Sequence, residues 1–127
     1  MSKTYEFLIE CGTFFVATTN DEMPSVRPFG GVMEYEGELY ISTAKYKNVY
    51  AEMSKNSSIQ IVAHKAGTRD WIRINGKAIE THDLNIKQAM LDACPALTRR
   101  FSKDSEDYAL FKITEMTSFL NKNRPVL

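Results

Sequence analysis

The sequence contains a set of polar side chains whose chemistry suits an anion. In chain order they are Arg27, Ser42, Thr43, Lys45 and Lys47. A guanidinium fork, an ammonium, two hydroxyls and the free N–H groups at a helix start can together bind a phosphate dianion. Each of these residues, taken singly, also fits an exposed position on a strand or a helix. As a group they favour a phosphate site over scattered surface residues.

Two predicted β-hairpins would position these side chains. They pair Phe14–Thr19 with Ser25–Phe29, and Val32–Tyr35 with Leu39–Ser42. The first hairpin turns at the polar residues 20–22, and the second turns at residues 36–38, where Gly37 can adopt a positive φ. A helical pattern begins near Asn48. If the hairpins lie side by side, Arg27 of the first approaches the end of the second.

The remaining segments complete a mainly β pattern with short helices. Further strands are expected at Ser58–His64, Trp71–Thr81 and Tyr108–Leu120, and helices near residues 2–11, 48–55 and 84–94. Asp83 is a predicted N-cap, and Pro95 ends or kinks the last helix. Gly76 lies inside a long strand, which indicates a bulge or a close backbone approach. Apolar spacing in residues 108–120 also allows a helix, but their aromatic and β-branched content favours the strand.

Four strings occur in an order that resembles a known family: P-S-V-R-P-F, G-E-L-Y-I-S-T-A, K-Y-K-N and D-W-I-R-I-N-G-K-A. They resemble the pyridoxamine 5′-phosphate oxidase-like proteins, the FMN-binding split barrels, from about Tyr5 to Leu120. This resemblance implies an α+β fold, mainly β, in which a six- or seven-stranded antiparallel split barrel carries short flanking helices. It also implies a homodimer that binds FMN at its interface. The sequence itself shows no internal repeat and no linker, which predicts one domain over residues 1–127.

The resemblance assigns a cofactor role to particular residues. They are Arg27, Pro28, Phe29, Ser42, Thr43, Lys47, Asn48 and Trp71. Arg27 and Lys47 would hold the phosphate, with polar contacts from the two hydroxyls and from the helix start. The strand backbone at Pro28 and Phe29 would run along the isoalloxazine ring, and Trp71 would lie near the flavin.

Two features set this chain apart from the true oxidases. Its segment from Thr43 to Lys47 is shorter than their T-x-x-x-S-R-K form, and their C-terminal substrate-binding extension is missing from the sequence. Pyridoxamine phosphate oxidation is therefore not expected. Trp71 could equally plug a barrel end, and Arg73 on the same strand face is a candidate dimer or cofactor contact.

Composition and motifs exclude several other classes of function. Sixteen basic and sixteen acidic residues give no net charge, so neither nucleic acid nor an anionic membrane is an expected partner. The chain has no apolar run of about 20 residues and no signal-peptide pattern, which favours the cytoplasm. Cys11 and Cys94 are expected to be buried thiols, and His64 and His82 lack the companions of a zinc site. There is no G-x-S-x-G, G-x-G-x-x-G or P-loop motif.

Three hypotheses for the function remain. The first is a small FMN-dependent oxidoreductase with an unknown substrate, because flavin would supply the redox chemistry. The second is a non-catalytic flavin-binding protein connected with stress or storage. The third is a split barrel that binds another planar cofactor, such as haem or a deazaflavin, since a fold does not fix a function.

Overall fold

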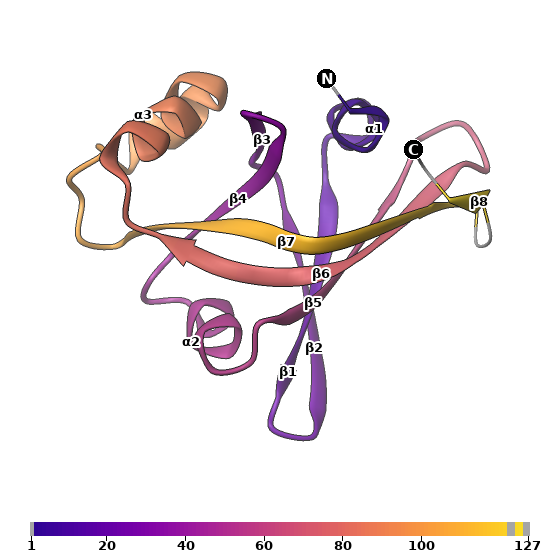
Figure 1. The fold of residues 1–127 in the computed structure, drawn as a ribbon, viewed down its shortest axis with the longest axis horizontal. Helices are drawn as coiled ribbons and strands as arrows, with labels where there is room; N and C mark the ends of the chain where they lie inside the picture. The colour runs from indigo at the N-terminus through magenta and orange to yellow at the C-terminus, as the bar shows by residue number, and fades with distance from the viewer. Residues whose placement is uncertain (1, 122–123, 126–127) are drawn as a thin grey trace.

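The computed structural model describes residues 2–121 and 124–125. Its elements are α1 (Lys3–Cys11), β1 (Phe14–Asn20), β2 (Met23–Phe29), β3 (Val32–Tyr35), β4 (Glu38–Ala44), α2 (Asn48–Lys55), β5 (Ser58–His64), β6 (Trp71–Thr81), α3 (Leu84–Ala93), the 3₁₀ helix η1 (Pro95–Arg99), β7 (Tyr108–Leu120) and β8 (Arg124–Pro125). The strands form one antiparallel sheet in the order β2-β1-β5-β6-β7-β4-β3, and β8 pairs with β7 (Figure 1). The end strands of this path, β2 and β3, are consecutive in the chain, yet they are not paired within the described residues.

The predicted fold class is confirmed. Seven antiparallel strands form the main path of an α+β, split-barrel-like fold with three short α-helices. The helices expected near residues 2–11, 48–55 and 84–94 are present, and the last segment, residues 108–120, is a strand. Both hairpins turn where expected, with Asp21, Glu36 and Gly37 at φ values of 55°, 50° and 79°. None of the helices in the described residues is both long and apolar enough to cross a membrane.

The second hairpin extends further than the sequence predicts. Strand β4 continues through Thr43 to Ala44, because these residues pair with Ala109 and Tyr108 of β7. Both Thr43 and Ala44 are buried. The strand therefore ends two residues later than expected, and the turn to α2 is made by residues 45–47.

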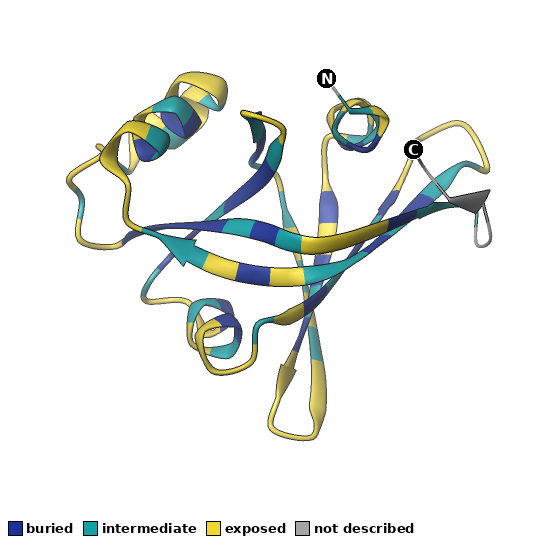
Figure 2. Cartoon of the chain, in the orientation of Figure 1, coloured by how far each residue is buried: buried dark blue, intermediate teal, exposed yellow. Residues whose placement is uncertain are grey.

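The inner face of the sheet carries the main hydrophobic core. Alternate residues of β5 and β6 point inward: Ile59, Ile61 and Ala63, and then Ile72 and Ile74. Figure 2 shows this alternation as dark blue segments on the central strands, while the tip of the β1–β2 hairpin is exposed. The alternation of apolar and polar residues along these strands follows from this one-sided burial.

A bulge lets the two longest strands bend. The register between β6 and β7 shifts between Asn75 and Lys77, on either side of Gly76. A Cβ atom added at Gly76 would lie 2.7 Å from Ile113 Cγ2 and 3.1 Å from the carbonyl oxygen of Thr114. Both predicted reasons for this glycine, a bulge and a close approach, are thus confirmed.

A smaller hydrophobic cluster fixes α3 against β3, β4 and β7. Its buried members are Met33, Tyr40, Met90, Leu91, Tyr108 and Leu110. Asp83 caps α3 as predicted, because its carboxylate accepts hydrogen bonds from the N–H groups of Asn85 and Ile86. Cys11 and Cys94 are free thiols, both partly buried. The cluster matters for the site because α3 leads directly into η1.

Candidate functional site

A cleft of about 400 Å³ lies where the end of β2, strand β4, the start of α2 and η1 meet. Six residues that the sequence assigns to a cofactor site line it together: Arg27, Pro28, Phe29, Ser42, Thr43 and Lys47. A second hollow shares Arg27 and Lys47 with this cleft and adds Asn48 and Glu52. The two hairpins and the start of α2 therefore bring six of the eight expected residues to one cleft.

The start of α2 faces these two hollows without a side-chain cap. Lys47 occupies the N-cap position with an extended backbone, and its side chain makes no capping hydrogen bond. No acidic residue lies in the first turn of α2. Ser2 of α1 and Asp83 of α3, by contrast, accept hydrogen bonds from their helices. The first N–H groups of α2 and the Lys47 ammonium are thus suited to an anion supplied from outside the chain.

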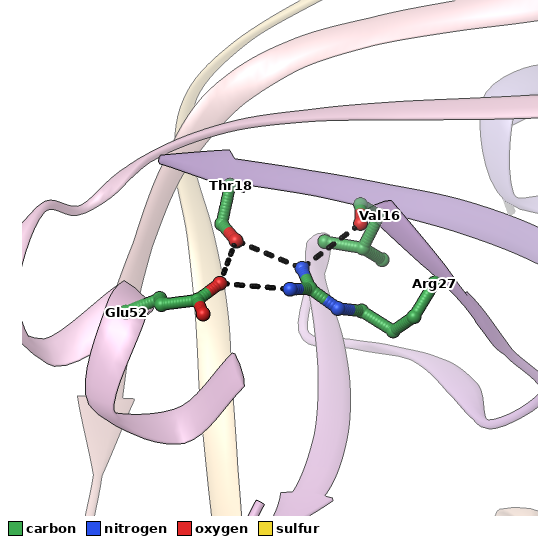
Figure 3. Close-up of polar contacts among 4 residues, drawn as sticks. All are labelled: Val16, Thr18, Arg27 and Glu52. Atoms are coloured by element: carbon green, nitrogen blue, oxygen red, sulfur yellow. Dashed lines mark hydrogen bonds and ion pairs between the residues drawn. The ribbon is translucent and has the colours of Figure 1, made fainter. Parts of the chain in front are cut away.

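Arg27 is already engaged within the chain (Figure 3). Its Nη1 donates to the carbonyl oxygen of Val16 at 3.1 Å and to Thr18 Oγ1 at 2.8 Å. Its Nη2 lies 2.7 Å from Glu52 Oε1 and forms an ion pair with it. The Arg27 side chain is 23% exposed and that of Glu52 is 10% exposed. A guanidinium has five N–H donors, so donors remain for a ligand in the cleft.

Glu52 balances the charge of Arg27. The Thr18 hydroxyl, which donates to Glu52 Oε1, and the Arg27 guanidinium hold the pKa of Glu52 below its ordinary value, although burial opposes them. The carboxylate is therefore ionised at neutral pH. Of the two cations that the sequence singles out for a phosphate, Lys47 is the exposed one that carries an unbalanced charge into the cleft.

The other wall of the cleft was not foreseen from the sequence. It is formed by η1 and the residues beside it, including Leu97, Arg99, Arg100 and Phe101, and by the backbone of Gly31. A Cβ atom at Gly31 would lie 3.4 Å from Ser42 Oγ and 3.9 Å from Leu97 Cδ1. The basic pair that follows Pro95 was visible in the sequence, but nothing local indicated that the chain returns toward β4 there.

Trp71 lies away from this cleft. It begins β6, at the opposite end of the sheet from α2 and α3 (Figure 1). The guanidinium carbon of Arg73 lies 5.1 Å from the Trp71 ring centroid, and Arg73 Nε is buried without a hydrogen-bond partner. Within one chain, Trp71 is therefore not a cleft residue. A contact with the cofactor from a second copy of the chain stays a prediction.

The two histidines also lie outside the cleft. Both are exposed. His64 Nε2 lies 2.7 Å from the carbonyl oxygen of Thr68 in the β5–β6 turn. His82 Nδ1 lies 4.0 Å from Glu80 Oε2. Neither ring is positioned to act on a molecule in the cleft of its own chain.

Comparison with known proteins shows which family this chain resembles. Residues 2–119 match the sequence profile described as "Pyridoxamine 5′-phosphate oxidase". A crystal structure of a NimC/NimA family protein from Clostridium acetobutylicum is similar, with a TM-score of 0.92 and 33% identity over 98% of this chain and 90% of that one. No curated protein gives a significant match.

Two more distant structures share the fold. The General Stress Protein 26 of Bacillus anthracis str. Sterne has a TM-score of 0.79 and 16% identity over 96% of this chain and 93% of that one. A heme binding protein from Mycobacterium smegmatis has a TM-score of 0.69 and 15% identity over 87% of this chain and 49% of that one. The profile match covers almost the whole chain, and the chain therefore belongs to the pyridoxamine 5′-phosphate oxidase-like family.

Proposed function

We propose that this chain binds FMN in the cleft between β2, β4, α2 and η1, and that it is a small flavin-dependent oxidoreductase. The observation that carries the proposal is the convergence of Arg27, Ser42, Thr43 and Lys47 on one cleft beside an uncapped helix start. The phosphate belongs at the α2 end, where Lys47 and backbone N–H groups supply charge and donors. FMN would supply the redox chemistry.

The rest of the cleft suits the body of a flavin. Its volume of about 400 Å³ falls within the range of roughly 300–1,000 Å³ that is usual for ligand pockets. Pro28 and Phe29 lie at the end of an edge strand of the sheet path, so their backbone is open to a planar ring. Gly31 leaves space against Ser42 that a larger residue would fill. These residues would bind and orient the flavin ring, and the charges around it would tune the electronic properties of the ring.

Haem is the weaker candidate for this cleft. A haem iron usually takes an axial ligand from His, Cys, Met or Tyr. None of the described residues that line the cleft is of these four types. The absorbance spectrum of the purified protein distinguishes flavin, deazaflavin and haem directly, and turnover with a reduced nicotinamide distinguishes an enzyme from a non-catalytic flavin-binding stress protein.

A homodimer fits the outer face of the β1–β2 hairpin. Phe15 is 46% exposed and Val26 is 67% exposed, and the exposed Pro28 pairs with Phe15 across the two strands. An apolar surface on adjacent strands is a common mark of a contact surface. Because Pro28 also lines the cleft, a second copy on this face would cover the flavin ring. The cytoplasm is the expected location.

The test compares FMN with riboflavin, which lacks the phosphate. In the unmodified protein, FMN should bind more tightly than riboflavin in a titration followed by flavin fluorescence. The Lys47→Gln variant should lose about 1.5–3 kcal/mol of FMN binding, the usual contribution of a hydrogen bond to a charged group, and should bind riboflavin as before. Lys55→Gln is the matched control, because Lys55 lies at the far end of the same helix, about 12 Å away by helix rise.

Three outcomes decide the proposal. A flavin spectrum with an FMN preference that Lys47→Gln weakens and Lys55→Gln keeps supports it. Equal affinity for FMN and riboflavin in the unmodified protein removes the phosphate site. Binding of haem but of neither flavin overturns the assignment of FMN.

A further inference from the structure

The second hollow, of about 490 Å³, continues the flavin cleft beyond the proposed phosphate site. It lies between α2 and the β1–β2 hairpin, where α2 packs against β1 (Figure 1). Arg27, Lys47 and Val49 line both the cleft and the hollow. The two spaces therefore meet at the start of α2. A group attached to the flavin phosphate, on the side away from the ring, would enter the hollow.

The walls of this hollow are mostly polar. Asn48 and Glu52 of α2 line it, and they share one face of the helix because they are four residues apart. The hairpin contributes the amide of Asn20 and the hydroxyl of Ser25. Amides and hydroxyls can each donate and accept hydrogen bonds. The lining therefore suits a polar group that carries hydroxyls.

Glu52 supplies a hydrogen-bond acceptor that lacks a donor. Its side chain is 10% exposed, and its Oε1 accepts hydrogen bonds from Thr18 and Arg27. Its Oε2 forms no hydrogen bond or ion pair with any described residue, and Figure 3 shows it turned away from these contacts. The lowered pKa of Glu52, caused by the Thr18 hydroxyl and the Arg27 guanidinium, keeps the carboxylate ionised. An ionised carboxylate can only accept, so a ligand in the hollow should bring donors to Oε2.

The position of this carboxylate favours a ribose over a free anion. Glu52 would repel a phosphate placed directly against it, whereas the neighbouring hydroxyls of a ribose can donate to it. An acidic side chain binds adenosine ribose in this way in dinucleotide-binding folds. Asn48 and Glu52 are about 6 Å apart along the helix axis. A phosphate at the helix start and a ribose at Glu52 therefore fit the order of groups in a nucleotide.

We propose that this hollow binds the adenosine monophosphate half of FAD, so that the site holds FAD more tightly than FMN. This inference rests on the proposed function, because it takes the flavin ring and the first phosphate to occupy the cleft. The second phosphate would lie near Arg27 and Lys47, whose two positive charges exceed the single negative charge of Glu52. Glu52 Oε2 would accept hydrogen bonds from the ribose hydroxyls, and Asn20 and Ser25 would contact the rest of the adenosine.

The experiment titrates the flavin-free protein with riboflavin, FMN and FAD in a calorimeter. FAD should bind roughly 3- to 10-fold more tightly than FMN, as expected for one additional net hydrogen bond. Without contacts in the hollow, the adenosine half adds bulk and charge but no affinity. The ratio of the FAD affinity to the FMN affinity is therefore the quantity to compare between variants.

Two variants assign the gain to the hollow. Glu52→Gln keeps an oxygen for Arg27 and replaces the acceptor at Oε2 by an amide donor, so it should remove the advantage of FAD. Ser25→Trp should fill the hollow and weaken FAD without weakening FMN, because Ser25 does not line the flavin cleft and a strand accommodates an aromatic residue. Glu22→Gln is the matched control, because Glu22 is exposed in the hairpin turn and lines neither space. Thermal unfolding checks that each variant folds.

The remaining outcomes separate this inference from the proposed function. The inference is overturned, although FMN binding stands, if FAD binds no more tightly than FMN in the unmodified protein. A ratio that either variant leaves unchanged, or that Glu22→Gln lowers as much, also overturns it. If no flavin binds, the proposed function fails, and titration with AMP decides the hollow by itself. AMP should then bind more tightly than its 2′,3′-dideoxy form, and equal binding of the two overturns the ribose contact.

Discussion

Replacing Arg27 by Met should destabilise the fold. The change removes the cationic partner of Glu52, whose side chain is 10% exposed, and it takes a donor away from Thr18. Breaking a buried ion pair from one side costs about 3–5 kcal/mol. Because the Arg27 side chain is 23% exposed, water can reach part of the pair, and we expect roughly 2–3 kcal/mol.

A double-mutant cycle isolates the pair from its surroundings. Glu52→Gln removes the charge of the partner and keeps an oxygen acceptor for Arg27. The Arg27→Met/Glu52→Gln variant leaves no unpaired charge, so it should be less destabilised than the sum of the two single changes by roughly 1–2 kcal/mol. Urea unfolding at pH 7 followed by circular dichroism gives each free energy.

The same pair predicts how stability depends on pH. The pKa of Glu52 is held below its ordinary value of 4.5 by the Thr18 hydroxyl and the Arg27 guanidinium. A carboxyl whose pKa is lower in the folded state contributes stability above its unfolded pKa, and this is lost as pH falls through the folded pKa. The unmodified protein should therefore lose stability below pH 4.5 more steeply than Glu52→Gln.

The exposed ion pair of Lys55 with Asp21 is a matched control. Its side chains are 77% and 75% exposed, so Lys55→Met should cost no more than about 1 kcal/mol. A cost for Arg27→Met as small as that of Lys55→Met would refute the reasoning. It would mean that Arg27 points to solvent and that the ionised Glu52 is not stabilised by Arg27.

Two further predictions concern the strands. Gly76→Ala should cost about 1–3 kcal/mol in urea unfolding, because the new methyl group would meet Ile113 and the Thr114 carbonyl, and a cost below about 0.5 kcal/mol would contradict this packing. For the proposed homodimer, Val26→Asp should give monomers in sedimentation at micromolar concentration while Ile79→Asp, at an exposed residue of β6, does not. A monomeric unmodified protein would contradict the homodimer.

Much of the fold could be predicted because its signals are local. In residues 58–64, every second residue is apolar and buried, because only one face of this strand packs against the core. This period of two residues is visible within a stretch of seven residues. Asp83 sits directly before an amphipathic helix, and Gly37 sits at the tip of a hairpin. The end of β4 was missed because Thr43 and Ala44 are held in the strand by β7, more than 60 residues later.

The site was predictable only in part, for the same reason. Arg27 and Lys47 could be placed near one another from the hairpins and the helix start that follows them. Glu52 could not be recognised as the partner of Arg27, since that contact depends on how α2 packs against β1, the strand that pairs with β2. Arg99 and Arg100 follow Pro95, and their position depends on α3 docking against β3, β4 and β7 rather than on any local pattern.

The pairing of Arg27 changes how the proposed phosphate site should work. From the sequence, Arg27 and Lys47 are equivalent cations. In the structure, Glu52 cancels the charge of Arg27, so the net positive charge at the α2 end comes from Lys47 and the uncapped helix start. The long-range attraction of an anion depends on the net charge of its binding site. A guanidinium that is held in place and has unused N–H donors instead fixes the orientation of the bound anion. Lys47 should therefore control how fast FMN associates and how this rate depends on salt, while Arg27 should control how long FMN stays bound.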